Sequence, residues 1–209
     1  MKILLYLGLN HGNSFDTMRK GFDMCYGFEA IPELANKLTE RYKNDDRVEI
    51  INAAVCGENK QQTFYISTNT LMESSSLGEL SDYYRSNGPK NQIGTKRKVI
   101  VDGIILSDFL IERGIDHIDT YVSDIEGMDY FVLTTIKDYV NEKKIDHIQV
   151  EAECDHWDGQ SHDNLPSNKE SLFYKFLDEN YKLTKQQQGN YNTTDDKRWF
   201  HRDLYFDKK

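Results

Sequence analysis

The stretch Val122-Ser123-Asp124-Ile125-Glu126-Gly127-Met128-Asp129 ends a short apolar run in carboxylates and a glycine. In open α/β sheets, ligands bind beyond the carboxyl ends of the strands, so this pattern predicts a functional strand end. The chain opens with a second apolar run that ends in glycines, Ile3-Leu4-Leu5-Tyr6-Leu7-Gly8-Leu9-Asn10-His11-Gly12. Together, the two stretches predict a fold that binds a nucleotide-type cofactor.

Apolar runs rich in β-forming residues alternate with helix-like stretches along the chain. Such alternation predicts βαβ units that build a parallel sheet. The expected strands are Ile3–Leu7 and residues 22–28, 48–55, 120–123 and 145–152, and the expected helices lie at residues 13–20, 32–42, 110–113, 130–140 and 172–177. Two further segments, residues 181–184 and 199–206, predict a hairpin that closes the sheet, and residues 67–98 form an insertion of low hydrophobicity.

The composition describes a soluble globular protein and weighs against several classes of function. The chain has 209 residues, of which 38% are hydrophobic and 29% are charged. Its apolar runs are shorter than the roughly 20 residues of a membrane-spanning helix, and a net charge of −9 disfavours a nucleic-acid partner. Three widely spaced cysteines favour a reducing compartment over a disulfide framework. We therefore expect one domain over residues 1–209, in the cytoplasm, without membrane insertion.

The first expected strand ends in a glycine turn, and the second ends in an acid. A glycine turn before a helix allows the backbone to approach a ligand closely. The spacing Gly8-x-x-x-Gly12 lacks the third glycine of the dinucleotide fingerprint, so a plain structural turn is the alternative. Glu29 follows about 20 residues after this turn, where a carboxylate can accept both ribose hydroxyls. The alternative for Glu29 is an exposed acid at a helix N-terminus.

Six segments, taken in order, resemble the motifs of the FkbM-type S-adenosylmethionine-dependent methyltransferases. They are Gly8-Leu9-Asn10-His11-Gly12, Phe28-Glu29-Ala30, Asn52-Ala53-Ala54, Ser75-Ser76-Leu77, Leu106-Ser107-Asp108 and Asp124-Ile125-Glu126-Gly127-Met128-Asp129. The resemblance spans roughly residues 4–135. It implies an α/β fold of the Rossmann-like class I methyltransferase type, in which a mostly parallel central sheet has helices on both faces and a C-terminal antiparallel hairpin.

The resemblance also implies S-adenosylmethionine as the cofactor and assigns residues to its parts. Residues of the glycine turn surround the methionine end, the acid after the second strand holds the ribose, and two residues after the third strand lie at the adenine edge. Asp124 lies beside the reactive methyl group. The implied cofactor-binding residues are Gly8, Asn10, Gly12, Glu29, Asn52, Ala53 and Asp124.

The chain departs from the family pattern at two positions. Tyr6 stands where the family usually has an aspartate that contacts the cofactor's amino group, and Val122 replaces the usual lysine before Asp124. These departures favour a second hypothesis, in which the chain is a noncatalytic interaction module of a larger enzyme. A nicotinamide-dependent oxidoreductase is a third hypothesis, which the missing third glycine disfavours.

Methyl transfer to an oxygen requires a base that removes the hydroxyl proton. Asp124 is one candidate base and His156 is another, while Glu153 shares one face of its strand with Glu151 because side chains alternate along a strand. The expected catalytic residues are Asp124, Glu153 and His156. The same three side chains could bind Mg²⁺ or Mn²⁺. The alternative is a hydrated acidic rim that binds no metal.

The resemblance implies that the acceptor is a hydroxyl of a sugar in a glycan or glycoconjugate. Trp157, Tyr191 and Trp199 could form an aromatic platform for a sugar ring, although aromatic residues are more often simply buried. Because the first strand begins almost at residue 2, the chain is either a domain of a larger glycan-synthesis protein, with that protein's other domains as partners, or a naturally minimal enzyme. His11 and His162 are expected in surface or loop positions.

Overall fold

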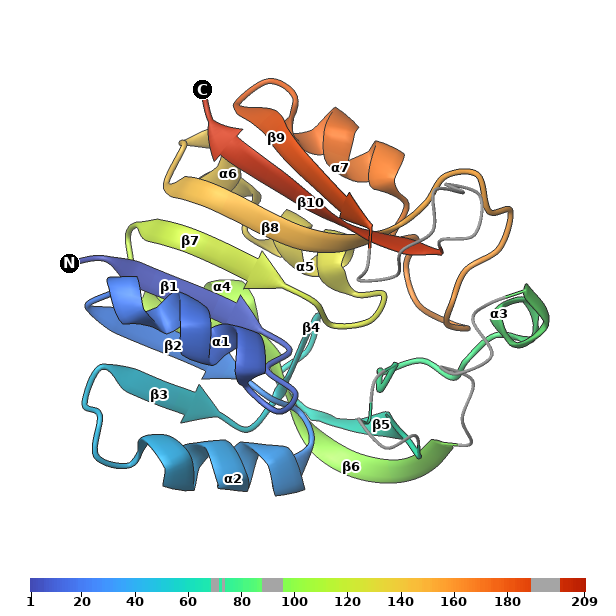
Figure 1. The fold of residues 1–209 in the computed structure, drawn as a ribbon, viewed down its shortest axis with the longest axis horizontal. Helices are drawn as coiled ribbons and strands as arrows, with labels where there is room; N and C mark the ends of the chain where they lie inside the picture. The colour runs from blue at the N-terminus through green and yellow to red at the C-terminus, as the bar shows by residue number, and fades with distance from the viewer. Residues whose placement is uncertain (69–71, 73, 88–95, 189–199) are drawn as a thin grey trace.

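The computed structural model describes residues 1–68, 72, 74–87, 96–188 and 200–209 (Figure 1). The described residues form a central sheet of seven strands. In spatial order these are β3 (Val48–Ile51), β2 (Met24–Phe28), β1 (Ile3–Leu7), β7 (Ile118–Ser123), β8 (Ile145–Glu153), β10 (His201–Lys208) and β9 (Tyr181–Gln188). The first five are parallel, and β10 runs antiparallel to both of its neighbours. The predicted parallel sheet with a C-terminal antiparallel hairpin is therefore confirmed.

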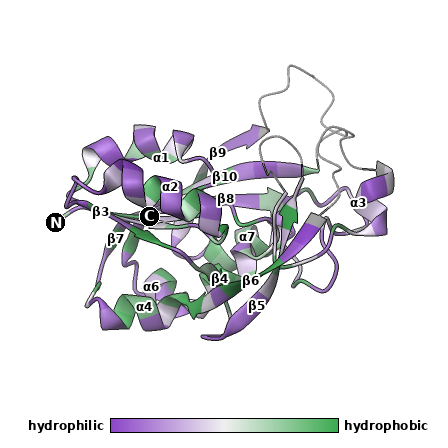
Figure 2. Cartoon of the chain, turned by 90° about the horizontal axis from the view of Figure 1, so that it is seen from below, coloured by the Kyte–Doolittle hydropathy of each residue, from purple (hydrophilic) through white to green (hydrophobic). Residues whose placement is uncertain are grey.

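Helices cover both faces of this sheet, as Figure 2 shows from below. Successive residues of β1 point to opposite faces and all are apolar or aromatic, which is typical of a parallel strand buried on both sides. Leu4 and Tyr6 pack with α1 and α2, whereas Leu5 and Leu7 pack with the layer of α4, α5, α6 and α7. The helices are α1 (Asn13–Met18), α2 (Pro32–Tyr42), α4 (Leu106–Glu112), α5 (Asp129–Thr135), α6 (Lys137–Asn141) and α7 (Glu170–Leu177). Within the described part of the chain, every helix is too short or too polar to span a membrane.

A second sheet of three strands lies beyond the ends of β1 and β2 (Figure 1). Its strands are β4 (Ala54–Cys56), β6 (Lys96–Ile105) and β5 (Gln61–Ser67), and α3 (Asp82–Asn87) lies between β5 and β6 in the chain. The prediction of one strand over residues 48–55 is wrong, because the chain leaves the main sheet at Asn52. The Asn52 side-chain amide donates to the carbonyls of Glu29 and Ala30 (2.8 and 3.2 Å), which holds the chain at this turn.

Two of the expected helices are interrupted. The helix expected at residues 13–20 ends in a 3₁₀ turn, Arg19–Gly21. The segment expected as one helix at residues 130–140 forms α5 and α6, which meet at Ile136. Near this break, the Thr135 hydroxyl donates to a carbonyl three residues earlier (2.7 Å), a local bond that competes with regular helical pairing. The apolar residues keep the same helical spacing across α5 and α6, which is why the sequence predicted one helix.

The ends of three neighbouring strands are joined through their backbones. The N–H of Asp124 donates to the carbonyl of Leu7 (3.1 Å), and the N–H of Gly8 donates to the carbonyl of Phe28 (3.0 Å). Gly8 has a φ of +84°, and a Cβ atom at this position would lie 1.9 Å from the Asp124 carbonyl oxygen. A glycine is therefore required where β1 and β7 approach each other.

We predict that Gly8→Ala destabilises the protein far more than Gly114→Ala. Both glycines have positive φ, but a Cβ atom at Gly114 would meet nothing within 4 Å. Gly114→Ala should therefore cost only the left-handed backbone penalty of about 1–2 kcal/mol, whereas Gly8→Ala should cost about 3 kcal/mol or more, because it also forces two backbones apart. Urea unfolding of the two variants measures the difference, and equal losses would contradict this account of the strand ends.

Candidate functional site

A cavity of about 320 Å³ opens at the carboxyl ends of β1, β2 and β7. A cavity of this size is within the range of small-molecule sites. Five of the residues predicted to bind a cofactor line it, although they come from separate parts of the sequence. They are Gly8, Asn10, Glu29, Ala53 and Asp124.

The other two predicted cofactor residues are not in the cavity wall and support its backbone instead. Gly12 has a φ of 77° and precedes α1, and its N–H donates to the carbonyl of Leu9 (2.8 Å), which closes the turn after β1. The side-chain amide of Asn52 donates hydrogen bonds to the carbonyls of Glu29 and Ala30. Both residues therefore fix the course of chain segments that carry lining residues.

The Glu29 carboxylate is buried, with 5% of the residue exposed, and is held by two backbone N–H groups. One carboxylate oxygen accepts from Asn10 (2.6 Å), and the other accepts from Ile31 (2.8 Å). Burial raises the pKa of Glu29 to about 7, and the two N–H groups oppose this rise. Each carboxylate oxygen can accept more than one hydrogen bond, so Glu29 can still receive a ligand's hydroxyl groups.

Asp129 organises the loop that follows β7. Its buried carboxylate accepts hydrogen bonds from the Ser123 hydroxyl (2.5 Å) and from the N–H groups of Ile125 (3.0 Å) and Gly127 (3.3 Å). Gly127 has a φ of +104°, which favours glycine. The acid that ends the predicted motif is therefore a structural residue of the loop, and Asp124 is the acid that lines the cavity.

Tyr6 lines the cavity at the position where the resembled family usually has an aspartate. The residue is 7% exposed, and its ring packs edge-on against Phe15 at 5.8 Å between ring centroids. Burial raises the pKa of Tyr6, and the nearby Asp124 carboxylate raises it further. Tyr6 is therefore a neutral hydroxyl in the wall, capable of donating or accepting one hydrogen bond where an aspartate could only accept.

The insertion of low hydrophobicity contributes to the cavity wall, and only its Ser-Ser-Leu motif indicated this in the sequence. Ser74, Ser75 and Leu77 line the cavity. The N–H of Ser74 donates to the Glu126 carboxylate (3.0 Å), and the Ser76 hydroxyl donates to the Glu126 carbonyl (2.7 Å). These contacts join the insertion to the loop after β7.

The structure does not bring His156 and Glu153 into the cavity with Asp124. His156 is exposed and its ring lies 5.5 Å from that of Trp157. Glu153 is buried outside the cavity, where its carboxylate accepts from the N–H (2.7 Å) and hydroxyl (2.6 Å) of Ser161 and lies 3.6 Å from the Lys169 ammonium. Among the described residues, Asp124, Glu153 and His156 do not form a group whose ligand atoms are close enough for one metal ion.

A different set of acids and one histidine meets beside the cavity. The side chains of Glu126, Glu151 and His201 have ligand atoms that all lie within 4.8 Å of one another, and Glu126 lines the cavity. Burial raises the pKa of Glu151, and Asp124 and Glu126 raise it further. Burial lowers the pKa of His201, and the nearby carboxylates of Glu126 and Glu153 oppose this shift. His201 could not be recognised from the sequence, because its contact with β8 depends on the pairing of β10.

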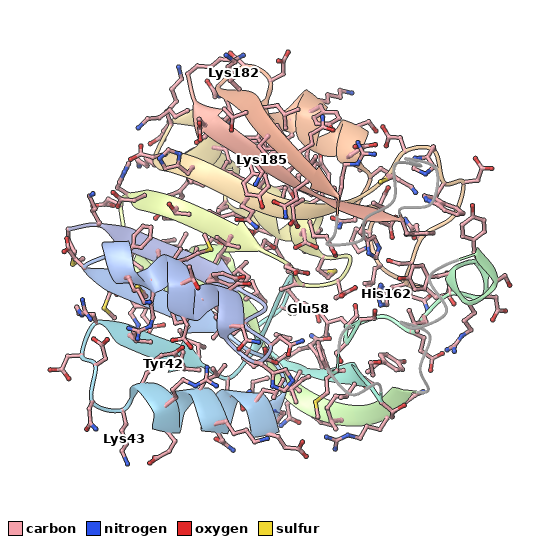
Figure 3. All side chains as sticks on the ribbon, in the orientation of Figure 1. Tyr42, Lys43, Glu58, His162, Lys182 and Lys185 are labelled. Carbon is pink, nitrogen blue, oxygen red and sulfur yellow. The ribbon has the colours of Figure 1, made fainter. Side chains whose placement is uncertain are left out.

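The burial of His162, a loop residue, could not be predicted from the sequence either. His162 lies in the loop between β8 and α7, as expected, but it is buried, with 2% of the residue exposed (Figure 3). Its Nδ1 atom lies 2.9 Å from the Ser161 hydroxyl. His11, also in a loop, is partly buried and lines the cavity.

An aromatic cluster lies next to His201. The Trp157 ring stacks on Phe200 at 5.2 Å, and Tyr83 meets both rings edge-on. The ring of His201 stacks on Tyr84 at 5.8 Å between ring centroids. Of the three residues predicted as a sugar platform, Trp157 belongs to this cluster, and Tyr191 and Trp199 lie outside the described residues.

Comparison with known proteins gives one match to a family and several to solved structures. A family model described as the methyltransferase FkbM domain matches residues 7–183. A search of curated proteins found no match. The chain is similar to the N-methyltransferase NodS from Bradyrhizobium japonicum WM9, with 10% identity, a TM-score of 0.48, and coverage of 99% of this chain and 85% of that chain. It is also similar to an S-adenosylmethionine-dependent methyltransferase from Clostridium acetobutylicum ATCC 824, with 8% identity, a TM-score of 0.49, and coverage of 99% and 83%.

The family match extends over most of the sequence and includes the ends of β1, β2 and β7 that form the cavity. It also includes Ser74, Ser75 and Leu77 of the insertion, which line the cavity, and the two strands, β7 and β8, that carry Asp124 and Glu151 at or near their ends. Because this model matches residues 7–183 of 209, the chain belongs to the methyltransferase FkbM domain family and is a methyltransferase of the S-adenosylmethionine-dependent class.

Proposed function

We propose that the protein transfers a methyl group from S-adenosylmethionine to a hydroxyl group, and that this hydroxyl belongs to a sugar of a glycan or glycoconjugate. The observation that carries the proposal is the cavity that Glu29 and Asp124 line together with the glycine turn after β1. A nucleoside fits such a cavity because a carboxylate can pair with ribose hydroxyls while a glycine permits close backbone approach. The bound cofactor supplies a methyl group on a positively charged sulfur.

Each part of the cofactor has a candidate position in the cavity. Glu29 would accept the ribose hydroxyls, while Gly8 and Asn10 would lie at the methionine end, and Ala53 at the adenine edge. The fit is supported by the glycine itself, since a Cβ atom at Gly8 has no room against the Asp124 backbone. The Asp124 carboxylate is attracted to positive charge, which favours it as the neighbour of the sulfonium.

The acceptor side of the cavity is acidic and can receive a proton. Asp124 is the candidate base within the cavity, and Glu151 and His201 lie beyond Glu126 on the same side. A base in this position removes the hydroxyl proton as the new bond to carbon forms. His156 has no such role in this proposal, because it is exposed outside the cavity.

The nearby aromatic cluster supports a sugar as the acceptor. Trp157, which is partly exposed, stacks on the buried ring of Phe200 next to His201. Aromatic faces pack well against the apolar C–H face of a sugar ring, and carboxylates accept hydrogen bonds from its hydroxyls. The combination favours a neutral polyhydroxylated acceptor over an anionic one, because the acids beside the cavity repel negative charge.

We predict that Glu29 makes nucleoside binding depend on pH. Because burial raises the pKa of Glu29 to about 7, the empty site holds a proton at low pH. Ribose hydroxyls donate to the charged carboxylate, so the bound nucleoside favours the deprotonated form. The affinity for S-adenosylhomocysteine, measured by calorimetry, should therefore rise roughly tenfold between pH 6 and pH 8.

Two variants separate this effect from a general change in the pocket. Glu29→Gln removes the titrating group and should flatten the pH dependence, while Glu29→Ala should weaken S-adenosylhomocysteine binding by roughly 10- to 100-fold, because the hydrogen bonds to a charged group are lost. If Glu29→Ala bound S-adenosylhomocysteine with unchanged affinity, Glu29 would not be part of the cofactor site.

We predict that Asp124→Asn lowers the turnover rate by about a hundredfold or more and leaves S-adenosylhomocysteine binding nearly unchanged, because that product has no positive sulfur. The assay follows tritiated methyl transfer from S-adenosylmethionine to a panel of oligosaccharides, methyl glycosides and amines, and NMR locates the new methyl group. Asp119→Asn is the matched control, because Asp119 lies at the other end of β7, where it accepts from the N–H of Ile3 (2.8 Å).

The possible products distinguish the proposed reaction from its alternatives. A methyl ether on a sugar supports the proposal, and label only in amines contradicts transfer to oxygen. Binding of S-adenosylhomocysteine without transfer to any acceptor favours the noncatalytic module, and absence of binding removes the cofactor site altogether.

A further inference from the structure

Three metal-ligating side chains from separate strands meet beside the cavity. Glu126 follows β7, Glu151 lies on β8 and His201 begins β10. One ligand atom from each lies within 4.8 Å of the others, and all three residues are partly buried. Ligand atoms on one ion lie roughly 3–4.4 Å apart when metal–ligand distances are about 2.0–2.2 Å. Small side-chain rotations would therefore bring the three atoms onto one ion.

The backbone fold places all three residues on one side of the sheet end. Glu126 has a φ of 55°, and the backbone of its loop is held by Asp129 and by the Ser76 hydroxyl. Glu151 and His201 lie on the same face of the sheet, because β8 and β10 pair with Glu151 opposite Asp203 and side chains alternate along each strand. The group is therefore formed by the fold and does not require rearrangement of a loop.

The ring of His201 is oriented by its aromatic neighbours. It stacks on Tyr84 with an interplanar angle of 13° and meets Phe200 edge-on at 5.2 Å. Its Nδ1 atom lies 3.7 Å from the Glu151 carboxylate, which is too long for a hydrogen bond. A separation of 3.7 Å lies within the range between two ligand atoms of one metal ion.

The surrounding charge favours a cation. Glu151 lies in the field of four other carboxylates, which belong to Asp124, Glu126, Asp129 and Asp203. One imidazole nitrogen with two carboxylates is a donor set that suits first-row transition metals such as Mn²⁺, whereas Ca²⁺ and Mg²⁺ prefer oxygen donors alone.

We propose that Glu126, Glu151 and His201 bind a divalent first-row transition-metal ion at the acceptor side of the cavity. The ion would hold hydroxyl oxygens of the acceptor and make one of them easier to deprotonate. This role of the ion rests on the proposed function, but binding of the ion by the three residues does not.

A second group of the same residue types provides a control. His117, Asp119 and Asp146 also have ligand atoms within 4.8 Å of one another, but they lie at the opposite ends of β7 and β8. All three side chains already have partners, because Asp146 pairs with His117 (3.1 Å) and with Lys208, and Asp119 accepts from the N–H of Ile3 (2.8 Å). His117 is also exposed. A histidine substitution here tests for adventitious binding at the surface.

The experiment titrates the full chain with Mn²⁺, followed by electron paramagnetic resonance and calorimetry, with and without saturating S-adenosylhomocysteine. We expect one Mn²⁺ per chain, and at least tenfold weaker binding in both Glu151→Gln and His201→Gln. We expect wild-type binding in His117→Gln. Pulsed electron paramagnetic resonance should detect a coupled imidazole nitrogen in the wild type that disappears in His201→Gln.

The controls separate failure of the metal site from failure of the fold or of the proposed function. Thermal unfolding and S-adenosylhomocysteine binding in the absence of metal identify any variant that has lost its fold. If either Glu151→Gln or His201→Gln has lost its fold, Mn²⁺ binding by the other variant tests the metal site. No Mn²⁺ binding, or equal binding in wild type, Glu151→Gln and His201→Gln, would overturn the metal site, even if S-adenosylhomocysteine binds normally. Loss of S-adenosylhomocysteine binding with intact Mn²⁺ binding would contradict the cofactor site alone.

Discussion

The cavity depends on the close approach of Gly8 to the backbone of Asp124. The Asp124 N–H bonds to Leu7 and the Gly8 N–H bonds to Phe28, so three strand ends are fixed relative to one another. A side chain at Gly8 would occupy the space of the Asp124 carbonyl. This contact brings Glu29 and Asp124 to the same cavity, because each residue comes directly after one of the strand ends that the contact fixes.

The parts of this arrangement that follow from local pattern could be predicted from the sequence. Strand Ile3–Leu7 has the predicted bounds, because a continuous apolar run bounded by glycine has few alternative structures. Glu29 and Asp124 could be recognised as strand-end acids, and parallel strands bring their carboxyl ends to one edge of the sheet. Their presence in one cavity agrees with that reasoning.

The parts that depend on long-range pairing could not be predicted. The strand predicted over residues 48–55 is interrupted at Asn52, because the Asn52 amide donates to carbonyls more than 20 residues earlier in the chain. His201 lies near Glu151 only because of the register of β10 on β8. His156, the histidine predicted for the site, is closer to β8 in the sequence, but it is exposed. Proximity in sequence therefore pointed to His156, which the structure places outside the cavity. Glu153 shares the predicted strand face, but Ser161 holds it outside the cavity.

A crystal structure of the chain with S-adenosylhomocysteine would show whether the cavity at the ends of β1, β2 and β7 is the cofactor site. We expect this arrangement: both ribose hydroxyls within hydrogen-bonding distance of the Glu29 carboxylate, the adenine beside Ala53, and the sulfur facing Asp124. Ligand bound in another cavity, or bound in this one with its ribose away from Glu29, would contradict it.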